Sequence, residues 1–312
     1  MSALRFDGRV AVITGGGRGL GREYALLLAG LGAKVVVNDP GLPIRGEAGA
    51  ADVGPAEEVV AAIRTAGGTA IANLDSVATP EGGAAIIKAA TDAYGRIDIL
   101  IHNAGNVRYG SLTEISDEDF RAVVDVHFMG AFNVVRAAFP VMAEAKYGRI
   151  VLTSSIGGIY GNKRCVNYAM SKAAMTGLNN VTALEGEDVG VKCNVIVPSA
   201  VTRMADGLDT SQYPPLGPEL VAPMVGWLAH ESCSVTGEML AAVGGRMARA
   251  FIAETPGVYQ ASWTVDEVGE TIAQIRMKDG PGGEANAAVL DFGLHGHVEH
   301  LTYSFGRARA GV

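Results

Sequence analysis

The sequence predicts an α/β fold. We expect a doubly wound parallel sheet, Rossmann-like, built from residues 1–250 as a single domain and followed by a C-terminal extension at residues 251–312. Short apolar runs alternate with helical patterns of about 10 to 15 residues, which is typical of parallel sheets. A glycine cluster, Gly15–Gly21, joins the first predicted strand to the first predicted helix. Polar or glycine residues follow one predicted strand after another, which indicates a site along one edge of the sheet.

Composition narrows the class of protein. The 312 residues are 48% hydrophobic and 19% charged, which excludes disorder and predicts a large core. The formal net charge is -8 and no stretch concentrates lysine and arginine, so we expect neither a nucleic-acid partner nor an anionic membrane surface. The apolar runs are too short, and too often broken by glycine, to span a membrane.

The cysteines and the N-terminus bear on the compartment. Three cysteines lack paired spacing, which favours neither a disulfide framework nor a zinc site, and we predict no metal. The first residues, Met1–Asp7, contain no apolar signal segment. We therefore expect a reducing, cytoplasmic location. The three cysteines are Cys165, Cys193 and Cys233.

The individual elements follow from the same patterns. Ser116 and Thr264 each precede a helical pattern and have an acidic residue three positions later, which predicts helix N-caps. Glycine, proline and polar residues predict a surface loop at 40–55 and a mobile lid over substrate at 203–218. Apolar runs predict strands at 10–13, 34–37, 69–74, 97–101, 149–155, 193–198 and 239–245. Helical patterns occupy 22–28, 55–65, 81–94, 116–139, 168–178, 220–230 and 264–272.

The glycine cluster indicates a phosphate-binding turn. It stands between a strand and a helix N-terminus, where free N–H groups and the helix dipole face an anion. Glycine lets the backbone approach a pyrophosphate closely. The spacing G-x-x-x-G-x-G differs from the commoner G-x-G-x-x-G, and a lone cluster of this kind also fits an ordinary turn. The candidate residues here are Gly15, Arg18, Gly19, Leu20 and Gly21.

Asp39 ends the second predicted strand, about 20 residues after the glycine cluster. A carboxylate there can accept hydrogen bonds from the ribose hydroxyls of adenosine and would repel a 2′-phosphate, which favours NAD over NADP. Arg18 could pair with such a phosphate and indicates the opposite preference. We give Asp39 the greater weight, although its place before Pro40 and Gly41 also fits a turn residue.

Further candidates follow the next predicted strands. Asp75 and Ser76 come after the third strand, where Asp75 would lie at the adenine end of a dinucleotide. Asn103, Ala104 and Gly105 form a turn of small residues that could lie along a flat cofactor. Because the carboxyl ends of parallel strands meet at one edge, these residues should line the same site as the glycine cluster.

Tyr168 and Lys172 stand four residues apart in a helical pattern, so their side chains share one helix face. An ammonium beside a phenol favours the phenolate and lowers the phenol pKa. Ser155, at the end of the preceding strand, could hold a substrate oxygen against that phenol. The three side chains suit proton transfer to or from an alcohol or carbonyl oxygen. The Tyr-xxx-Lys spacing alone also occurs by chance, so the surrounding motifs decide.

Together these motifs resemble the short-chain dehydrogenase/reductase family. The Thr14–Gly21 cluster, the Asn103–Gly105 turn, Ser155 and the Tyr168–Lys172 pair follow the family's order and spacing over residues 6–247. The resemblance implies that Tyr168 is the general base and that Ser155 holds the substrate oxygen. It also implies that Lys172 lowers the pKa of Tyr168 and binds the nicotinamide ribose. Hydride would pass from a carbinol carbon to the nicotinamide ring.

A narrower resemblance concerns the substrate. Several segments look like the dehydrogenase part of peroxisomal multifunctional enzyme type 2. That resemblance implies oxidation of a (3R)-3-hydroxyacyl-CoA to the 3-ketoacyl-CoA with NAD, and relatives act on steroid or steroid-side-chain hydroxyls. The segments are residues 4–10, 36–39, 115–119, 158–162 and 227–233.

Two positions depart from the general family pattern. Many members have an asparagine where His127 stands, which completes a water-linked proton relay with the lysine, whereas the narrower group carries histidine. We interpret His127 as a buried, hydrogen-bonded helix residue and leave it out of the catalytic set. The usual Pro-Gly is Pro198-Ser199 here, so contacts to the nicotinamide carboxamide would fall to Pro198 and Thr202.

The extension goes beyond the usual family domain. Its spacing His295-x-His297-xx-His300 could suggest a metal site, but it fits better a solvated extended arm or a strand that wraps a neighbouring subunit. We expect the extension to be associated with the oligomer or the pocket. Because oligomers are usual in the family, we expect a homodimer or homotetramer.

The leading hypothesis is an NAD-dependent alcohol dehydrogenase for a small-molecule substrate, either a hydroxyacyl thioester or a bulky steroid-like acyl-CoA. One alternative is an NADP-dependent 3-ketoacyl reductase, which Arg18 would favour. Another is a non-catalytic dinucleotide-binding partner, which the intact Ser155, Tyr168 and Lys172 argue against. The segments 106–113, 157–165 and 203–218 should form the pocket, and their sequence does not specify the substrate.

Overall fold

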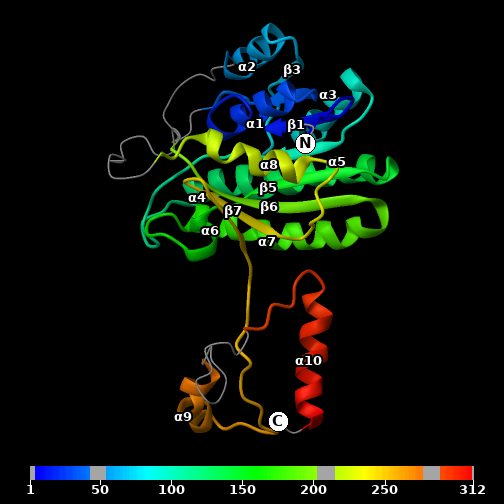
Figure 1. The fold of residues 1–312 in the computed structure, drawn as a ribbon. Helices are drawn as coiled ribbons and strands as arrows, with labels where there is room; N and C mark the ends of the chain where they lie inside the picture. Colours follow the sequence, from blue (N-terminus) through cyan, green and yellow to red (C-terminus); the bar gives the residue numbers. More distant parts are fainter. Residues whose placement is uncertain (1–3, 43–53, 202–214, 277–288, 311–312) are drawn as a thin grey trace. The chain divides into compact units, whose positions relative to one another are not determined.

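The computed structural model describes residues 4–42, 54–201, 215–276 and 289–310 (Figure 1). Thr202 and most of the predicted segments 40–55 and 203–218 lie outside these residues. The chain divides into two compact units, Met1–Arg249 and Ala250–Val312, and each is described by itself.

The first unit is built on an eight-stranded sheet with the strand order β3-β2-β1-β4-β5-β6-β7-β8. Strands β1 to β7 pair in parallel, and the order reverses direction at β1 and β4, as in a doubly wound sheet. The predicted fold class is confirmed. The strands are β1 Val10–Thr14, β2 Lys34–Asn38, β3 Thr69–Asn73, β4 Ile99–His102, β5 Gly148–Thr153, β6 Val191–Ser199, β7 Met239–Val243 and β8 Arg246–Ala250.

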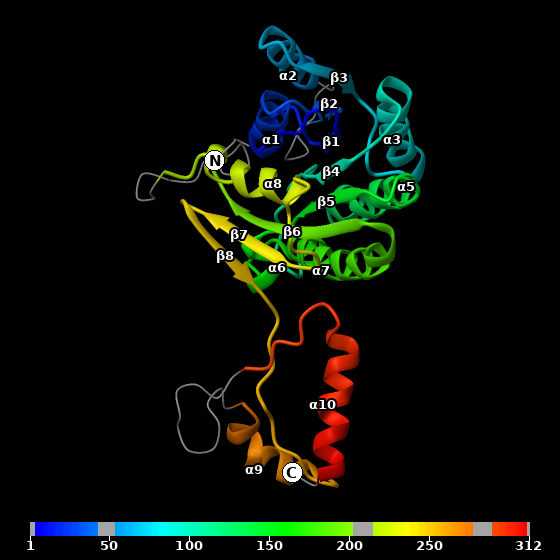
Figure 2. The ribbon, with the colours of Figure 1, turned by 45° about the vertical axis from the view of Figure 1, so that its right-hand side comes forward.

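The sequence patterns predict no strand after 239–245, and this expectation is wrong, because β8 follows β7 and ends the sheet. Gly244 and Gly245 connect the two strands with φ values of 56° and 82°, a left-handed conformation that glycine adopts without strain. A two-residue connection between neighbouring strands requires an antiparallel hairpin. Figure 2 shows β7 and β8 side by side at the end of the sheet.

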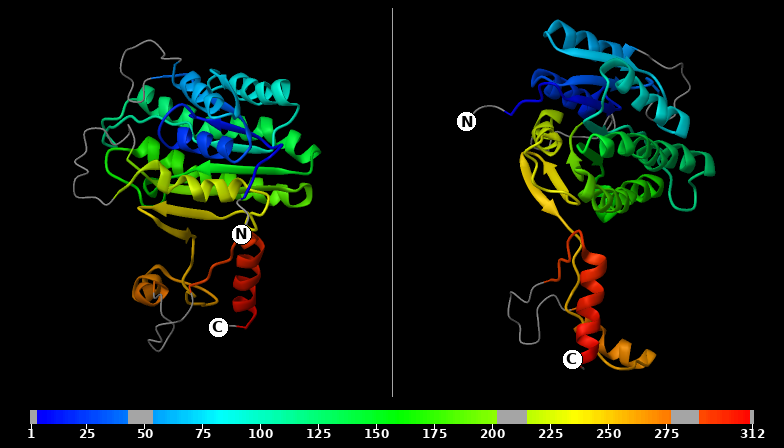
Figure 3. Two further views of the ribbon diagram at one scale, coloured as in Figure 1. Left: turned by 45° about the horizontal axis from the view of Figure 1, so that its top comes forward. Right: turned by 90° about the vertical axis from the view of Figure 1, so that its right-hand side faces the viewer.

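Helices cover both faces of the sheet (Figure 3). Helix α1 packs with α2 and α8, whereas α3 packs with α5, and α7 packs with α4, α5 and α6. Ile13, Val37 and Ile101 are buried on the α1 side, and the alternate residues are buried too, as expected for a parallel sheet covered on both faces. The helices of this unit are α1 Gly19–Gly30, α2 Gly54–Thr65, α3 Pro80–Tyr94, α4 Asp117–Val124, α5 Gly130–Glu144, α6 Ile156–Tyr160, α7 Val166–Gly186 and α8 Ala222–Ala229.

The helix predicted over 116–139 is interrupted. Ser116 caps α4 as predicted, since its hydroxyl accepts from Asp119 N at 3.1 Å. A π-helical segment, Asp125–Met129, then separates α4 from α5. By length and composition the stretch Asp117–Glu144 is apolar enough to cross a membrane, contrary to the expectation that no run is. In this fold its apolar side is buried against the other elements of the unit, with Val134, Ala138 and Met142 almost wholly covered.

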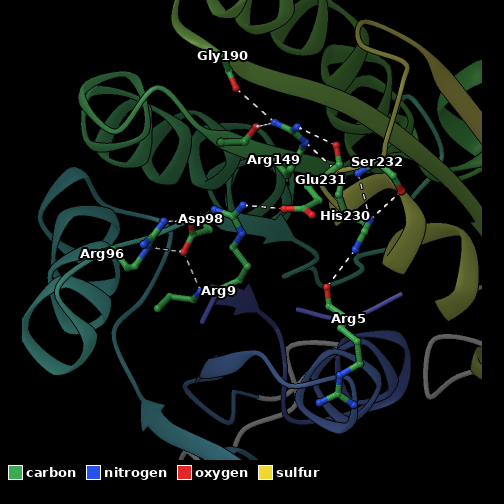
Figure 4. A network of polar contacts seen from close by, with 11 residues as sticks. Arg5, Arg9, Arg96, Asp98, Arg149, Gly190, His230, Glu231 and Ser232 are labelled. Atoms are coloured by element: carbon green, nitrogen blue, oxygen red, sulfur yellow. Dashed lines mark hydrogen bonds and ion pairs between the residues drawn. The ribbon is translucent and has the colours of Figure 1, made fainter. Parts of the chain in front are cut away.

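Ion pairs connect several segments at the edge of the sheet where β1 and β4 begin (Figure 4). Asp98, which is 1% exposed, accepts from Arg9 Nη1 at 3.0 Å, from Arg96 Nε at 2.8 Å and from Val10 N at 2.9 Å. Arg9 also donates to Glu231, which lies after α8. One buried carboxylate thus connects segments that are far apart in the sequence.

Replacing Asp98 with asparagine is expected to lower the free energy of unfolding by about 2–3 kcal/mol, because the partly exposed Arg9 and Arg96 would lose hydrogen bonds to a charged group. Urea denaturation of the full chain measures the change. The exposed ion pair Lys88–Asp92 provides the control, since Asp92→Asn should leave stability unchanged. Equal losses in the two variants would contradict this account of Asp98.

The second unit contains α9 Val265–Ile275 and α10 Gly296–Ala310. Thr264 caps α9 in a capping box with Glu267, as predicted. The predicted extended arm around His295–His300 is wrong, because most of it belongs to α10. His300 lies 3.3 Å from the Glu254 carboxylate and edge-on to the Phe292 ring, so it is held by local contacts. The described residues contain no group of three or more side chains able to hold a metal ion.

Candidate active site

The predicted strand ends share one edge of the sheet. In the parallel register Thr14 lies opposite Asn38 on one side and His102 on the other, and β5 and β6 continue in the same direction. The residues that follow these strands therefore emerge together, and this part of the prediction is confirmed.

The glycine turn after β1 is closely packed against the turn after β4. Gly15 has a φ of 61°, and its carbonyl accepts from Asn103 Nδ2 at 3.0 Å. A Cβ on Gly21 would overlap the Gly15 carbonyl, so the turn requires glycine there. Helix α1 begins at Gly19 after an extended Arg18 whose side chain does not cap it, and its first turn carries no acidic residue. The turn and helix N-terminus fit the pyrophosphate of a dinucleotide.

Asp39 is tied to this turn. Its carboxylate accepts from Gly17 N at 3.1 Å and from Gly41 N at 2.8 Å. A side chain on Gly17 would crowd both Asp39 and Pro55. The turn-residue interpretation of Asp39 is therefore correct in part, and the same contacts place the carboxylate beside the glycine turn. Each oxygen keeps a further lone pair with which it can accept from a ribose hydroxyl.

The remaining predicted cofactor-binding residues are Asp75, Ser76, Leu20 and Pro198. Asp75 is exposed, and its carboxylate accepts from Asn73 Nδ2 at 2.7 Å. The Ser76 hydroxyl accepts from Ala78 N at 3.2 Å within the same turn. Leu20 packs against the core, and Pro198 lies within β6 opposite Ala242 of β7.

Ser155, Tyr168 and Lys172 come together from two elements. Ser155 follows β5 and caps α6, accepting from Gly157 N at 3.1 Å. Tyr168 and Lys172 lie near the start of α7, and the Lys172 ammonium donates to Thr153 O at the end of β5 at 2.7 Å. The ammonium lies 5.7 Å from the centroid of the Tyr168 ring. A side chain on Gly158 would overlap Lys172, so glycine lets α6 pack directly on α7.

The electrostatics differ from the prediction for Tyr168. Burial raises the pKa of Tyr168, and the group that lowers it is the Ser155 hydroxyl through a hydrogen bond, so the net shift is upward. The largest cause of the shift is the burial of Tyr168 itself, which disfavours the charged phenolate. Burial also lowers the pKa of Lys172, to about 7. The predicted net lowering of the Tyr168 pKa is therefore wrong for this arrangement.

His127 is buried, as predicted, and lies in the π-helical segment. Its Nε2 is 3.0 Å from Asn106 N and 2.8 Å from Asn106 O. Its ring meets the Tyr168 ring edge-on, with centroids 5.3 Å apart and planes at 83°. The sequence reasoning missed His102, which is buried at the end of β4 between Thr14 and His127. Its position immediately before the Asn-Ala-Gly turn is the feature of the sequence that could have identified it.

The sheet and the Ser155, Tyr168 and Lys172 constellation define a Rossmann-like oxidoreductase. The family model for short chain dehydrogenase matches residues 9–212. The chain belongs to the short-chain dehydrogenase/reductase family.

Two named proteins illustrate the similarity. Peroxisomal multifunctional enzyme type 2 of Drosophila melanogaster is 49% identical over 243 residues, covering 78% of this chain and 40% of that protein, so the chain spans less than half of its length. Its full-length structure matches with a TM-score of 0.78 and 36% identity, over 97% of this chain and 50% of that one. A short chain dehydrogenase from Mycobacterium avium matches with a TM-score of 0.76 and 36% identity, over 88% and 96%. The predicted resemblances are confirmed.

Proposed function

We propose that this chain is an NAD-dependent dehydrogenase that oxidises the hydroxyl of a (3R)-3-hydroxyacyl-CoA or of a bulky steroid-like substrate. The observation that carries the proposal is the meeting of Ser155, Tyr168 and Lys172 at the sheet edge that also bears the glycine turn and Asp39. The resemblance to multifunctional enzyme type 2, which implies a hydroxyacyl-CoA substrate, supports this substrate class.

The reacting side chains have distinct roles in this proposal. The Ser155 hydroxyl donates to or accepts from the substrate oxygen and keeps it against the Tyr168 phenol. Tyr168 takes the proton of the alcohol as general base. Lys172, with one of its three donors bound to Thr153 O, has donors left for the ribose hydroxyls of the cofactor. When bound, the nicotinamide dinucleotide supplies the hydride acceptor.

A panel of substrates tests the proposal. Purified chain is assayed for reduced dinucleotide with (3R)- and (3S)-hydroxyacyl-CoA of increasing chain length and with hydroxysteroids, each with NAD and with NADP. Turnover of a (3R)-hydroxyacyl-CoA or a hydroxysteroid with NAD supports the proposal. Turnover of hydroxyacyl substrates confined to NADP, together with reduction of 3-ketoacyl-CoA by NADPH, would establish the reductase alternative, which Arg18 favours. No turnover with any pair would leave the binding-protein alternative.

Replacing Asp39 with alanine is expected to shift the preference between the dinucleotides towards NADP by about tenfold or more, because a like-charge repulsion against the 2′-phosphate disappears. The ratio of kcat/KM for NAD and NADP measures the shift. Asp39→Asn separates charge from shape, since an amide oxygen can still accept from Gly17 N or Gly41 N. An unchanged ratio in both variants would show that Asp39 serves only the turn.

A further inference from the structure

Thr14, at the end of β1, is a buried hydrogen-bonding centre. Its Oγ1 lies 3.1 Å from three nitrogens: Asn103 N, Ala104 N and His102 Nδ1. The two backbone N–H groups can only donate, so they use the lone pairs of the hydroxyl. The single hydroxyl proton is then directed to His102 Nδ1, which must accept it.

These hydrogen bonds determine which nitrogen of the His102 ring carries the proton. With Nδ1 as an acceptor, the ring proton is on Nε2, which lies 3.2 Å from the His127 carbonyl oxygen and donates to it. His102 is 1% exposed, and burial together with the nearby Lys172 lowers its pKa to about 3. The imidazole is therefore neutral, and each of its nitrogens has a partner.

The two partners of His102 belong to opposite sides of the site. Thr14 supports the turn Asn103–Gly105, whose Asn103 side chain in turn bonds the phosphate-binding turn at Gly15. His127 packs its ring edge-on to Tyr168. The two sides also touch directly, because a Cβ on Gly105 would overlap the His127 ring.

We infer that His102 is a positioning residue that joins the dinucleotide side of the site, through Thr14, to the Tyr168 side, through the His127 carbonyl. The inference rests on the proposed function, because it assigns Tyr168 to the reacting atoms and the Asn103–Gly105 turn to the cofactor. The role needs two different nitrogens on one rigid ring, an acceptor at Nδ1 and a donor at Nε2.

Two substitutions remove the two hydrogen bonds of His102 one at a time. An asparagine at 102 can place an acceptor where Nδ1 lies, so His102→Asn keeps the Thr14 bond and loses the His127 bond. A glutamine can place a donor where Nε2 lies, so His102→Gln does the reverse. His102→Phe keeps the ring shape and loses both bonds.

The readouts are the Kd of NAD and NADP by fluorescence titration, kcat at saturating dinucleotide, and the thermal midpoint. We expect His102→Asn to lower kcat about tenfold with little change in Kd. A fall of about tenfold is the effect that the loss of one buried hydrogen bond produces. His102→Gln should raise Kd about tenfold and affect kcat less. His102→Phe should show both changes. If the Phe variant does not fold, the contrast between Asn and Gln decides.

His230 is the matched control. It is a second buried histidine with both nitrogens bonded, to Ser232 Oγ and Arg5 O, near the ion-pair edge (Figure 4). His230→Phe should lower the thermal midpoint and leave kcat and Kd unchanged. If the three His102 variants behave like His230→Phe, or if Asn and Gln act alike, the inference is wrong. Should the wild type show no turnover, the proposed function fails, while the Kd contrast still tests the Thr14 half.

Discussion

Tyr168→Phe is expected to reduce kcat by about a thousandfold or more while the Kd of the dinucleotide stays within about twofold. The phenol oxygen is the only atom removed, and it is the atom that takes the proton of the alcohol in the proposed mechanism. The ring that packs edge-on to His127 remains, so the surrounding site keeps its shape. Steady-state kinetics and dinucleotide fluorescence separate the two effects.

A second phenol serves as control for Tyr168. Tyr94, in α3, also has a pKa raised by burial, and its hydroxyl has no hydrogen-bond partner in the described structure. Tyr94→Phe should leave kcat and Kd unchanged. Retained turnover in Tyr168→Phe would sink the proposed mechanism, and a parallel loss of dinucleotide binding would show that Tyr168 acts mainly in binding.

Lys172→Met is expected to abolish activity and at the same time to stabilise the fold at neutral pH. Lys172 is 4% exposed, and burial lowers its pKa from 10.5 to about 7, so folding discourages its charged form. Burying the charged ammonium therefore destabilises the fold by on the order of a few kcal/mol, because each unit of pKa shift corresponds to about 1.4 kcal/mol. The lost bond to Thr153 O offsets part of the gain, about 1–2 kcal/mol.

The pH dependence isolates the charge. Below about pH 7 the lysine is protonated in both states, so the wild type bears the full penalty. Between about pH 7 and 10.5 the unfolded chain binds more protons than the folded one, so wild-type stability rises with pH. The stability advantage of Lys172→Met should therefore shrink over that window. Urea denaturation at about pH 7 and about pH 9 measures both variants.

Lys192 provides the comparison for Lys172. Its ammonium also donates to a backbone carbonyl, Cys233 O at 2.6 Å, but it lies outside the proposed site. Lys192→Met should lower stability and preserve turnover. A destabilised Lys172→Met with no pH-dependent difference from the wild type would contradict the buried-charge account.

The fold was predictable where one residue property dominated. Runs such as Val10–Ile13 and Val35–Val37 are apolar and mostly β-branched because both faces of a parallel strand are covered, and the structure has strands there. β8 was missed because Arg246 and Arg249 give it no apolar run, and its existence depends on pairing with β7. The helical α10 was missed for a similar reason, since its histidine-rich start resembled a solvated arm.

The site was predictable in position more than in electrostatics. Parallel register alone brings Thr14, His102 and the end of β5 to one edge, so any reading of the strands places the candidates together. The direction in which the pKa of Tyr168 shifts depends on how deeply the phenol itself is buried, which sequence spacing does not encode. The role of His102 depends on which atoms its two nitrogens meet in space.

The π-helical segment Asp125–Met129 determines where this region can change length. A π turn contains one residue more than an α turn, so deleting one residue there would restore a continuous α-helix. Because the wide turn already absorbs the additional residue, the deletion would leave the rotation of α4 relative to α5 nearly unchanged. Asn133 could then keep its bond to Val77 O, whereas the turn that holds His127 against Asn106 would be lost. We therefore expect chains that lack this wide turn to align with this one through a gap of one residue in the segment.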